Sequence, residues 1–473
     1  DVIDAHPMLI GGCIWDWVDQ ALWKENPDGT AFYAYGGDYG DVPNDGPFCC
    51  NGLIAADRTP HPHYWEVKKV HAPVKVEAVD LAAGRLRIHN RHMSLNLAAL
   101  ALEWELSNED GTIEQDTVAG VDLPAGQNME ILLPLALRSV CDETLLTVRF
   151  ALPHSTAWAD AGHVVAWDQF ALPITSPIPY SALRSAEITE NEASIVLAAA
   201  GCRAEIDRQS GLLVSYSIDG EEVLKEPMRP DFWRAPTDND RGWKMPERLA
   251  LWRDAGTRTH CIGVYGTDDC RQLDLTVPVG ETALELSYRM ANDGALTVGY
   301  LLQPIGDDLP DMPRVGLQFA LPAELSQIEW FGLGPHECYR DRKTGATVAR
   351  HRANIEEWIH SYVHPQENAN REEVRWVRFL APSGTGIEIE ALGEPFSVGA
   401  WPYTRHDLET AAHDHELPRR DAITVNIDCA QMGIGGDNAW GATVHKQYRL
   451  PADQAYEYSF TIRPCPAHVV QSM

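Results

Sequence analysis

The stretch that decides the fold reads LELSYRMANDGALTVGYLL and runs from residue 284 to residue 302. Apolar side chains occupy every second position from Leu284 to Met290 and again from Leu296 to Leu302. Such alternation is typical of a strand with one face in a core and the other in solvent. The central Asn-Asp-Gly supplies the positive φ angle that a tight turn needs. The stretch therefore predicts an antiparallel β-hairpin.

The same alternation recurs over most of the chain. Residues 102–106 read LEWEL and residues 148–152 read VRFAL, with turn signals such as Glu-Asp-Gly at 109–111 between such runs. Short strands of this kind over about 100 residues predict an immunoglobulin-like β-sandwich for residues 74–176. The segment TSPIP at 175–179 is typical of a linker. The strand-rich remainder, with a further turn predicted at Asp219-Gly220, indicates a large antiparallel β-sandwich over residues 177–473.

Residues 1–73 have a mixed α/β character instead. The apolar run Met8 to Trp15 predicts a short buried strand. Residues 16–24 have helix-like apolar spacing, and residues 25–63 form a long loop region rich in Gly, Pro, Asn and Asp. Residues 63–74 predict a helix that stops near Pro73. The fold class is therefore mainly β, with one mixed segment at the start.

Composition and charge limit the possible partners. The chain has 473 residues, of which 44% are hydrophobic and 23% charged, as expected for a globular protein of about three domains. Its formal net charge of −31 repels phosphate backbones and anionic lipids, so we expect neither nucleic acid nor a membrane as a partner. The ten cysteines show no C-x-x-C spacing, and no N-x-S/T sequon occurs. These features favour a cytoplasmic location.

Two stretches in the first segment combine residue types that bind sugars or cations. Residues 11–20 read GGCIWDWVDQ, where Trp rings can cover the C–H face of a sugar and carboxylates can accept its hydroxyl protons. Residues 35–52 read YGGDYGDVPNDGPFCCNG, a long polar loop whose oxygen donors suit Na⁺ or Mg²⁺. The alternatives are core tryptophans followed by acidic residues at a helix start, and a solvated turn region.

A third stretch, MGIGGDNAW at 432–440, is rich in glycine. It lacks the G-K-[ST] of a phosphate loop, so we discard that interpretation. The glycines could instead hold Trp440 exposed, with a buried core Trp440 as the alternative. Two histidine pairs, at 61 and 63 and at 413 and 415, have no third partner in register, and we interpret them as surface or turn histidines.

Together these motifs resemble the large bacterial β-galactosidases of glycoside hydrolase family two. The resemblance rests on residues 11–20, 35–51, 57–62, 234–240, 332–335, 362–368 and 432–440. It implies that residues 1–73 are the end of a (β/α)₈ barrel, namely its last strand, site loop and helix. An immunoglobulin-like β-sandwich and a large C-terminal β-sandwich of β-galactosidase small-chain type would then follow.

The resemblance also implies a function. Members of the family are retaining enzymes that hydrolyse terminal β-D-galactosides such as lactose, and retention needs two carboxylates about 5–5.5 Å apart. In the family both are Glu on earlier barrel strands, and neither Glu25 nor Glu66 matches their motifs. We therefore assign no catalytic residue and expect the chain alone to be inactive. The implied partners are a β-galactoside substrate, the missing N-terminal half and, in the complete enzyme, further copies in a homo-oligomer.

Site residues follow from the same resemblance, position by position. Trp15 would form the aromatic floor beneath the galactose, and Trp440 would lie over the outer sugar of a disaccharide. Asn51 would meet the 6-hydroxyl region and a Na⁺ ion, to which Phe48 lends its backbone carbonyl. Asn44 would border the water shell of a Mg²⁺ ion. The other cation ligands would lie outside this chain, so we expect it to hold neither ion well alone.

Two further functions stay open at this point. The two sandwiches could form a non-catalytic carbohydrate-binding or interaction module. Alternatively, Asp16 and Asp19 could serve a self-sufficient hydrolase, although one barrel strand could not hold them opposed to each other. Gly242 resembles the first residue of a mobile loop near the site, where glycine would act as a hinge. We also expect residues 1–73 to be more protease-sensitive than the sandwiches.

Overall fold

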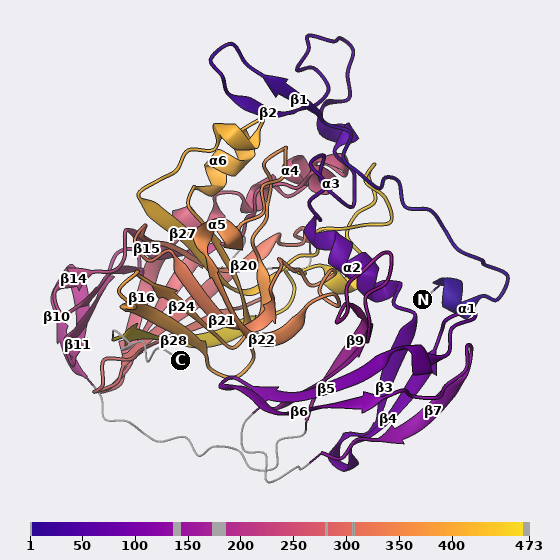
Figure 1. Cartoon of the computed structure of the whole chain (residues 1–473). Helices are drawn as coiled ribbons and strands as arrows, with labels where there is room; N and C mark the ends of the chain where they lie inside the picture. Colours follow the sequence, from indigo (N-terminus) through magenta and orange to yellow (C-terminus); the bar gives the residue numbers. More distant parts are fainter. Residues whose placement is uncertain are drawn as a thin grey trace.

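The computed structural model describes residues 2–135, 143–172, 186–279, 282–304, 306 and 308–466, and it is mainly β as predicted (Figure 1). The linker expected at residues 175–179 lies outside the described residues. Two antiparallel sandwiches make up most of the molecule, and a segment with little regular structure precedes them. Among the residues that the structure describes, no helix has both the length and the apolar character needed to cross a membrane.

The first segment contains four short elements and one longer helix. These are α1 (Val2–Ala5), β1 (Leu22–Glu25), β2 (Ala31–Ala34), the 3₁₀ turn η1 (Gly46–Cys49) and α2 (Pro62–Val70). Strands β1 and β2 pair as a hairpin that projects from the body of the molecule, whereas α2 packs close to both sandwiches (Figure 1). The helix predicted near residues 63–74 is confirmed as α2. Pro62 fits its first turn because that position needs no N–H donor.

Two predictions for this segment are wrong. Residues 8–15 are not a buried strand: within the range 2–135 they pair with no other strand, and Met8, Ile10 and Trp15 are exposed. Residues 16–24 are not a helix. The Asp19 N–H donates to the Ile54 carbonyl at 2.9 Å, and the chain then enters β1. The side chains of this apolar run are not buried because none of the described strands lies beside it.

The smaller sandwich consists of a three-stranded and a four-stranded sheet within the described residues. Its strands are β3 (Val74–Asp80), β4 (Arg85–Asn90) and β7 (Asn128–Leu132) in one sheet, and β6 (Gly111–Ala119), β5 (Ala101–Asn108), β8 (Leu145–Ala151) and β9 (Val164–Ala171) in the other. The 3₁₀ turns η2 (Leu81–Ala83) and η3 (Leu97–Ala99) connect them. Leu102, Trp104 and Leu106 point into the core between the sheets, as the alternation predicts.

The large sandwich consists of a ten-stranded and a nine-stranded sheet in the described part of the chain. The first holds β10 (Glu187–Glu190), β11 (Ser194–Ala199), β12 (Cys202–Asp207), β13 (Leu213–Ile218), β14 (Glu221–Glu222), β15 (Glu226–Asp231), β20 (Arg314–Pro322), β27 (Ala422–Gln431), β26 (Phe396–Trp401) and β23 (Arg371–Val374). The second holds β16 (His260–Gly266), β17 (Arg271–Val277), β18 (Thr282–Met290), β19 (Leu296–Leu302), β28 (Tyr456–Cys465), β25 (Gly386–Ala391), β24 (Trp376–Leu380), β21 (Gln327–Gly334) and β22 (Thr347–Asn354).

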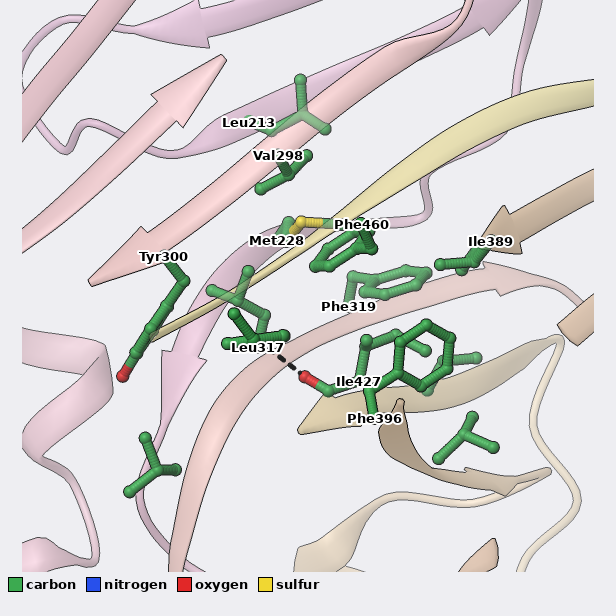
Figure 2. Close-up of a cluster of buried hydrophobic side chains, with 14 of the residues drawn as sticks. Leu213, Met228, Val298, Tyr300, Leu317, Phe319, Ile389, Phe396, Ile427 and Phe460 are labelled. Carbon is green, nitrogen blue, oxygen red and sulfur yellow. Dashed lines mark hydrogen bonds between the residues drawn. The ribbon is translucent and has the colours of Figure 1, made fainter. Parts of the chain in front are cut away.

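Apolar side chains from both sheets form a continuous core, part of which Figure 2 shows. Leu317, Phe319 and Ile427 come from the ten-stranded sheet, and Val298 and Phe460 come from the nine-stranded sheet. Short helices lie at the ends of the strands: α3 (Asp238–Gly242), α4 (Met245–Arg248), α5 (Ile355–Trp358) and α6 (Arg405–Thr410). The 3₁₀ turns of this sandwich are η4 (Ala250–Trp252), η5 (Ala255–Arg258), η6 (Asp414–Glu416) and η7 (Lys446–Tyr448).

The hairpin predicted over residues 284–302 is confirmed as β18 and β19. Its register pairs Leu284 with Leu302 and Met290 with Leu296, so the apolar side chains of both strands share one face. Gly294 has a φ of +88°, and a Cβ there would lie 2.7 Å from the Cys202 Sγ, so the turn requires glycine. The second predicted turn is also confirmed, because Asp219-Gly220 joins β13 to β14.

Polar contacts join α2 and the smaller sandwich to the large one. Glu66 on α2 accepts hydrogen bonds from the Gly345 N–H at 2.8 Å and from the Thr344 hydroxyl at 2.5 Å. Gln169 on β9 exchanges two hydrogen bonds with the backbone of Val348 on β22, at 2.8 and 2.9 Å. These contacts fix the position of α2, and with it the loop that precedes α2 in the sequence.

Candidate functional site

An aromatic pair joins the polar loop of the first segment to the glycine-rich turn of the large sandwich. The rings of Phe48 and Trp440 are stacked, with centroids 6.1 Å apart and planes inclined by 24°. Trp440 is nevertheless 76% exposed, so the core alternative for this residue is wrong. The fold therefore presents an open indole face beside residues that lie far away in the sequence.

The loop at 35–52 is anchored to the large sandwich by His413. Tyr35 stacks on the His413 ring with centroids 4.6 Å apart, and its hydroxyl donates to the Ala412 carbonyl at 2.5 Å. Asp38 Oδ2 lies 2.8 Å from His413 Nε2 and accepts the Tyr35 N–H at 2.8 Å. Burial, together with the nearby Asp38 charge, raises the pKa of Tyr35. His413 is thus a buried docking residue in the turn before η6, so the interpretation as a surface histidine is wrong for His413, whereas His415 is exposed as expected.

A second buried contact holds the other end of the loop. Asp19 accepts the Gly52 N–H through Oδ1 at 2.7 Å, and its Oδ2 lies 2.8 Å from His61 Nε2. The other ring nitrogen of His61 lies 2.8 Å from His360 Nε2 on the large sandwich. The interpretation of His61 and His63 as surface or turn histidines is also wrong, because His61 is buried and His63 Nε2 contacts the Gly52 carbonyl at 2.8 Å.

Burial governs the charge of two of these imidazoles, His63 and His360. It lowers the pKa of His63 and of His360 to about 4, so both rings are neutral at pH 7. A neutral ring can donate from one nitrogen and accept at the other, as the hydrogen bond between His61 and His360 requires. Asp19 and Gly52 hold the backbone of the loop in place through the contacts described above. A Cβ at position 52 would lie 2.2 Å from the Asp19 backbone nitrogen, so this close approach requires glycine.

Most of the remaining residues of the first motif are exposed, whereas Asp16 and Val18 are half-buried. Trp15 is 81% exposed, as a sugar-facing floor would need before its ligand binds. Asp16 accepts a hydrogen bond from the Gln20 side chain at 2.5 Å and another from the Trp17 N–H, also at 2.5 Å. Since both carboxylates of this motif already serve local contacts, their geometry gives no support to a hydrolase based on Asp16 and Asp19.

One oxygen in the loop fits a cation. Asn51 Oδ1 is buried, and no group in the described residues donates a hydrogen bond to it. Amide oxygens are suitable ligands for hard cations, so this atom matches the chemistry expected of a Na⁺ ligand. Asn44 differs, because its amide accepts the Gly46 N–H at 3.0 Å and donates to the Asp41 carbonyl at 2.9 Å. Across the described ranges, His, Cys, Asp and Glu side chains form no cluster of three or more that could hold a metal.

Three family models match this chain. The family model described as "Beta galactosidase small chain" matches residues 198–462, more than half of the chain. The chain belongs to the β-galactosidase small chain family. Two further models match the preceding parts: "Beta-galactosidase, domain 4" over residues 86–173 and "Glycosyl hydrolases family 2, TIM barrel domain" over residues 1–76. The chain thus corresponds to a C-terminal part of a β-galactosidase.

Named β-galactosidases match nearly the whole of this chain. Identity is 38% to the β-galactosidase of Priestia megaterium, over 98% of this chain and 46% of that protein. It is 34% to that of Halalkalibacterium halodurans, over 97% of this chain and 46% of that protein. It is also 34% to that of Vibrio cholerae, over 97% of this chain and 45% of that protein. The chain therefore spans about half the length of the curated relatives it matches.

Two residues near the candidate site have no role assigned from the sequence alone. One is His360, which approaches the loop from the large sandwich. The other is a buried Arg234, whose guanidinium contacts Asp240 at 2.8 and 3.0 Å. The Thr-x-x-Asp spacing at 237–240 is that of a capping box, which the structure contains at the start of α3. That spacing could have located the helix, but no local signal gives the tertiary partners.

Proposed function

We propose that this chain forms the substrate-pocket part of a retaining β-galactosidase that hydrolyses terminal β-D-galactosides such as lactose. The proposal places the pair of catalytic glutamates outside this chain, so that the chain alone is inactive. The observations that carry it are the stacked pair of Phe48 and Trp440 and the unpartnered side-chain oxygen of Asn51, which follows Phe48 in the same loop, in a chain whose family is that of β-galactosidases.

Each residue has a proposed role that follows from its surroundings. Trp15 offers an exposed ring to the apolar face of the galactose. Trp440, supported from one side by Phe48, offers its other face to the outer sugar of a disaccharide. A supported ring loses little conformational freedom when the sugar binds, which favours binding. Asn51 would contact the 6-hydroxyl region through its unpartnered oxygen.

Two cations belong to the proposal. Na⁺ would be held by Asn51 Oδ1 and the backbone carbonyl of Phe48, and would supply a positive charge that orients sugar hydroxyl groups. Mg²⁺ would lie beyond Asn44, whose own amide is already used within its loop. Both ions would need ligands from outside this chain. We further propose a cytoplasmic location, which the nine free thiols in the described ranges support, and, from the family resemblance alone, a homo-oligomer for the complete enzyme.

A non-catalytic carbohydrate-binding module is the second candidate. The observation that favours it is the exposure of Trp15 and Trp440, since exposed Trp rings can bind sugars without any catalytic group. The two functions differ in what the chain achieves by itself. A module would bind galactosides as an isolated chain, whereas a pocket wall would need the rest of the barrel.

Substitution of Asn51 in a complete β-galactosidase that contains this chain tests the proposal. We expect Asn51→Ala to raise both the KM for nitrophenyl-galactoside and the Na⁺ concentration that gives half-maximal activity. Asn128→Ala, at an exposed position on β7 of the smaller sandwich, is the matched control and should change neither value. Equal behaviour of the two variants would show that Asn51 contacts neither sugar nor cation and would count against the proposed site.

A further inference from the structure

The backbone of the turn that carries Trp440 is held by side chains from another part of the sandwich. Arg234 donates from Nη1 to the Met432 carbonyl at 2.5 Å and from Nη2 to the Gly433 carbonyl at 2.9 Å. Asn239, on α3, donates to the Ile434 carbonyl at 3.2 Å. Three successive carbonyl groups therefore have side-chain donors from residues 234–239. A turn held in this way has few alternative conformations, since leaving the carbonyls of the buried Met432 and Gly433 unpaired is costly.

Asp341 holds the same turn from another direction. Its Oδ2 accepts the Gly435 N–H at 2.8 Å. A Cβ at Gly433 would lie 2.6 Å from this oxygen, so the glycine makes the close approach possible. Asp341 itself lies in a tight turn, in which the N–H groups of Tyr339 and Arg342 each donate to the other residue's carbonyl, at 3.0 and 2.8 Å. The carboxylate thus reaches the glycine-rich turn from a fixed backbone.

The indole at the end of the turn is placed by further contacts. Asn438 Oδ1 accepts the Trp440 N–H at 2.9 Å. The backbone of Gly242, the last residue of α3, lies so close that a Cβ there would be 2.5 Å from the Ala439 carbonyl. Arg234 also binds Asp240 of α3 through two hydrogen bonds. The Arg234 guanidinium therefore connects α3 to the turn. Both α3 and the turn lie close to Trp440.

We propose that Asp341 and Asn239 are positioning residues that set the orientation of the Trp440 ring through the backbone of residues 432–435. Arg234 acts together with them. Because Arg234 is fully buried, its substitution would also impair folding. Neither Asp341 nor Asn239 is assigned any contact with substrate. The consequence of this arrangement for catalysis rests on the proposed function, in which Trp440 binds the outer sugar. The positioning of the Trp440 ring does not depend on that function.

A spectroscopic experiment on this chain tests the proposal without substrate. The chain is labelled with 5-fluorotryptophan at its 15 tryptophans, and the ¹⁹F resonance of residue 440 is assigned by its disappearance in Trp440→Phe. We expect Asp341→Ala and Asn239→Ala each to shift or broaden this resonance while the other tryptophan signals stay in place. Asp341→Asn, which keeps an acceptor oxygen, should retain the position of the original signal. Glu394→Gln, at an exposed carboxylate in the loop before β26, is the control for loss of one charge.

The outcomes separate the proposal from the function on which it partly rests. An unchanged Trp440 resonance in both alanine variants, with the chain folded, would overturn the positioning role. A general loss of signal dispersion in Asp341→Ala would show a folding defect, and Asn239→Ala, at a half-buried position, would then decide. In the complete enzyme, the same variants should raise the KM for lactose several-fold and leave the kcat for nitrophenyl-galactoside unchanged. A moved resonance with an unchanged KM would support the positioning role and contradict the role of Trp440 in sugar binding.

Discussion

Acidification should weaken the contact between the segment around α2 and the large sandwich. Four histidines in this region have a pKa lowered chiefly by burial, to about 4 for His63, His351 and His360 and to about 3 for His336. His336 stacks on Trp65 of α2 with centroids 6.0 Å apart, and His360 contacts His61, at the residue before α2. All four rings are therefore neutral in the folded protein at pH 7.

The sign of the effect follows from the direction of these shifts. The unfolded chain has ordinary histidines with a pKa of about 6.5, so between pH 6.5 and about 4 it binds more protons than the folded chain. The free energy of unfolding therefore falls as the pH falls through this window. A shift from 6.5 to about 4 corresponds to roughly 3 kcal/mol for each histidine. One such group is already a substantial part of the stability of a domain, about 5–15 kcal/mol.

Urea unfolding measured at several pH values between 7 and 4 checks this prediction. We expect the free energy of unfolding to decrease steeply below pH 6.5, and the slope to become smaller in His360→Gln because one titrating group is removed. His154→Gln, at an exposed position in the smaller sandwich, serves as the control and should leave the slope unchanged. A stability that does not vary between pH 6.5 and 4 would refute the reasoning, as would equal slopes for His360→Gln and the original chain.

Three further predictions follow from the packing and from the site. In the complete enzyme, Trp440→Ala should weaken the use of lactose by about 1–3 kcal/mol of lost apolar contact and leave galactose inhibition unchanged, and equal losses in both would contradict the sugar-binding role. Gly345→Ala should lower the melting temperature by loosening α2, because the new Cβ would lie 2.7 Å from the Trp65 backbone. The expected loss in the free energy of unfolding is about 1–3 kcal/mol. Gly12→Ala, where the new Cβ meets open space, is the neutral control. Limited proteolysis should cut first within the exposed residues 8–14, and first cuts inside the sandwich strands would contradict the packing described here.

Much of the fold could be predicted from local sequence. The alternation from Leu284 to Leu302 and the Asn-Asp-Gly between its halves specify a hairpin without reference to the rest of the chain, and the structure confirms it. The apolar run from Met8 to Trp15 could not be interpreted in the same way. An apolar run is buried only where neighbouring elements cover it, and none of the described residues does so here.

The site depended on contacts that no local pattern encodes. His61 looked like a surface histidine because its partners, Asp19 and His360, lie 42 and 299 positions away in the sequence. Trp440 could equally have been a core residue, and its exposure became clear only from the fold that places it against Phe48. Residue types and glycine content indicated which stretches carry a site, whereas partners and exposure required the structure.

The most direct test of the central claim is the rate of nitrophenyl-galactoside hydrolysis by the purified chain, measured with and without the preceding barrel segment of a β-galactosidase. The account predicts no turnover above background for the chain alone and measurable turnover once the segment that carries the two glutamates is supplied. Turnover by the chain alone that is abolished by Asp16→Asn would contradict it and would place the catalytic carboxylates within this chain.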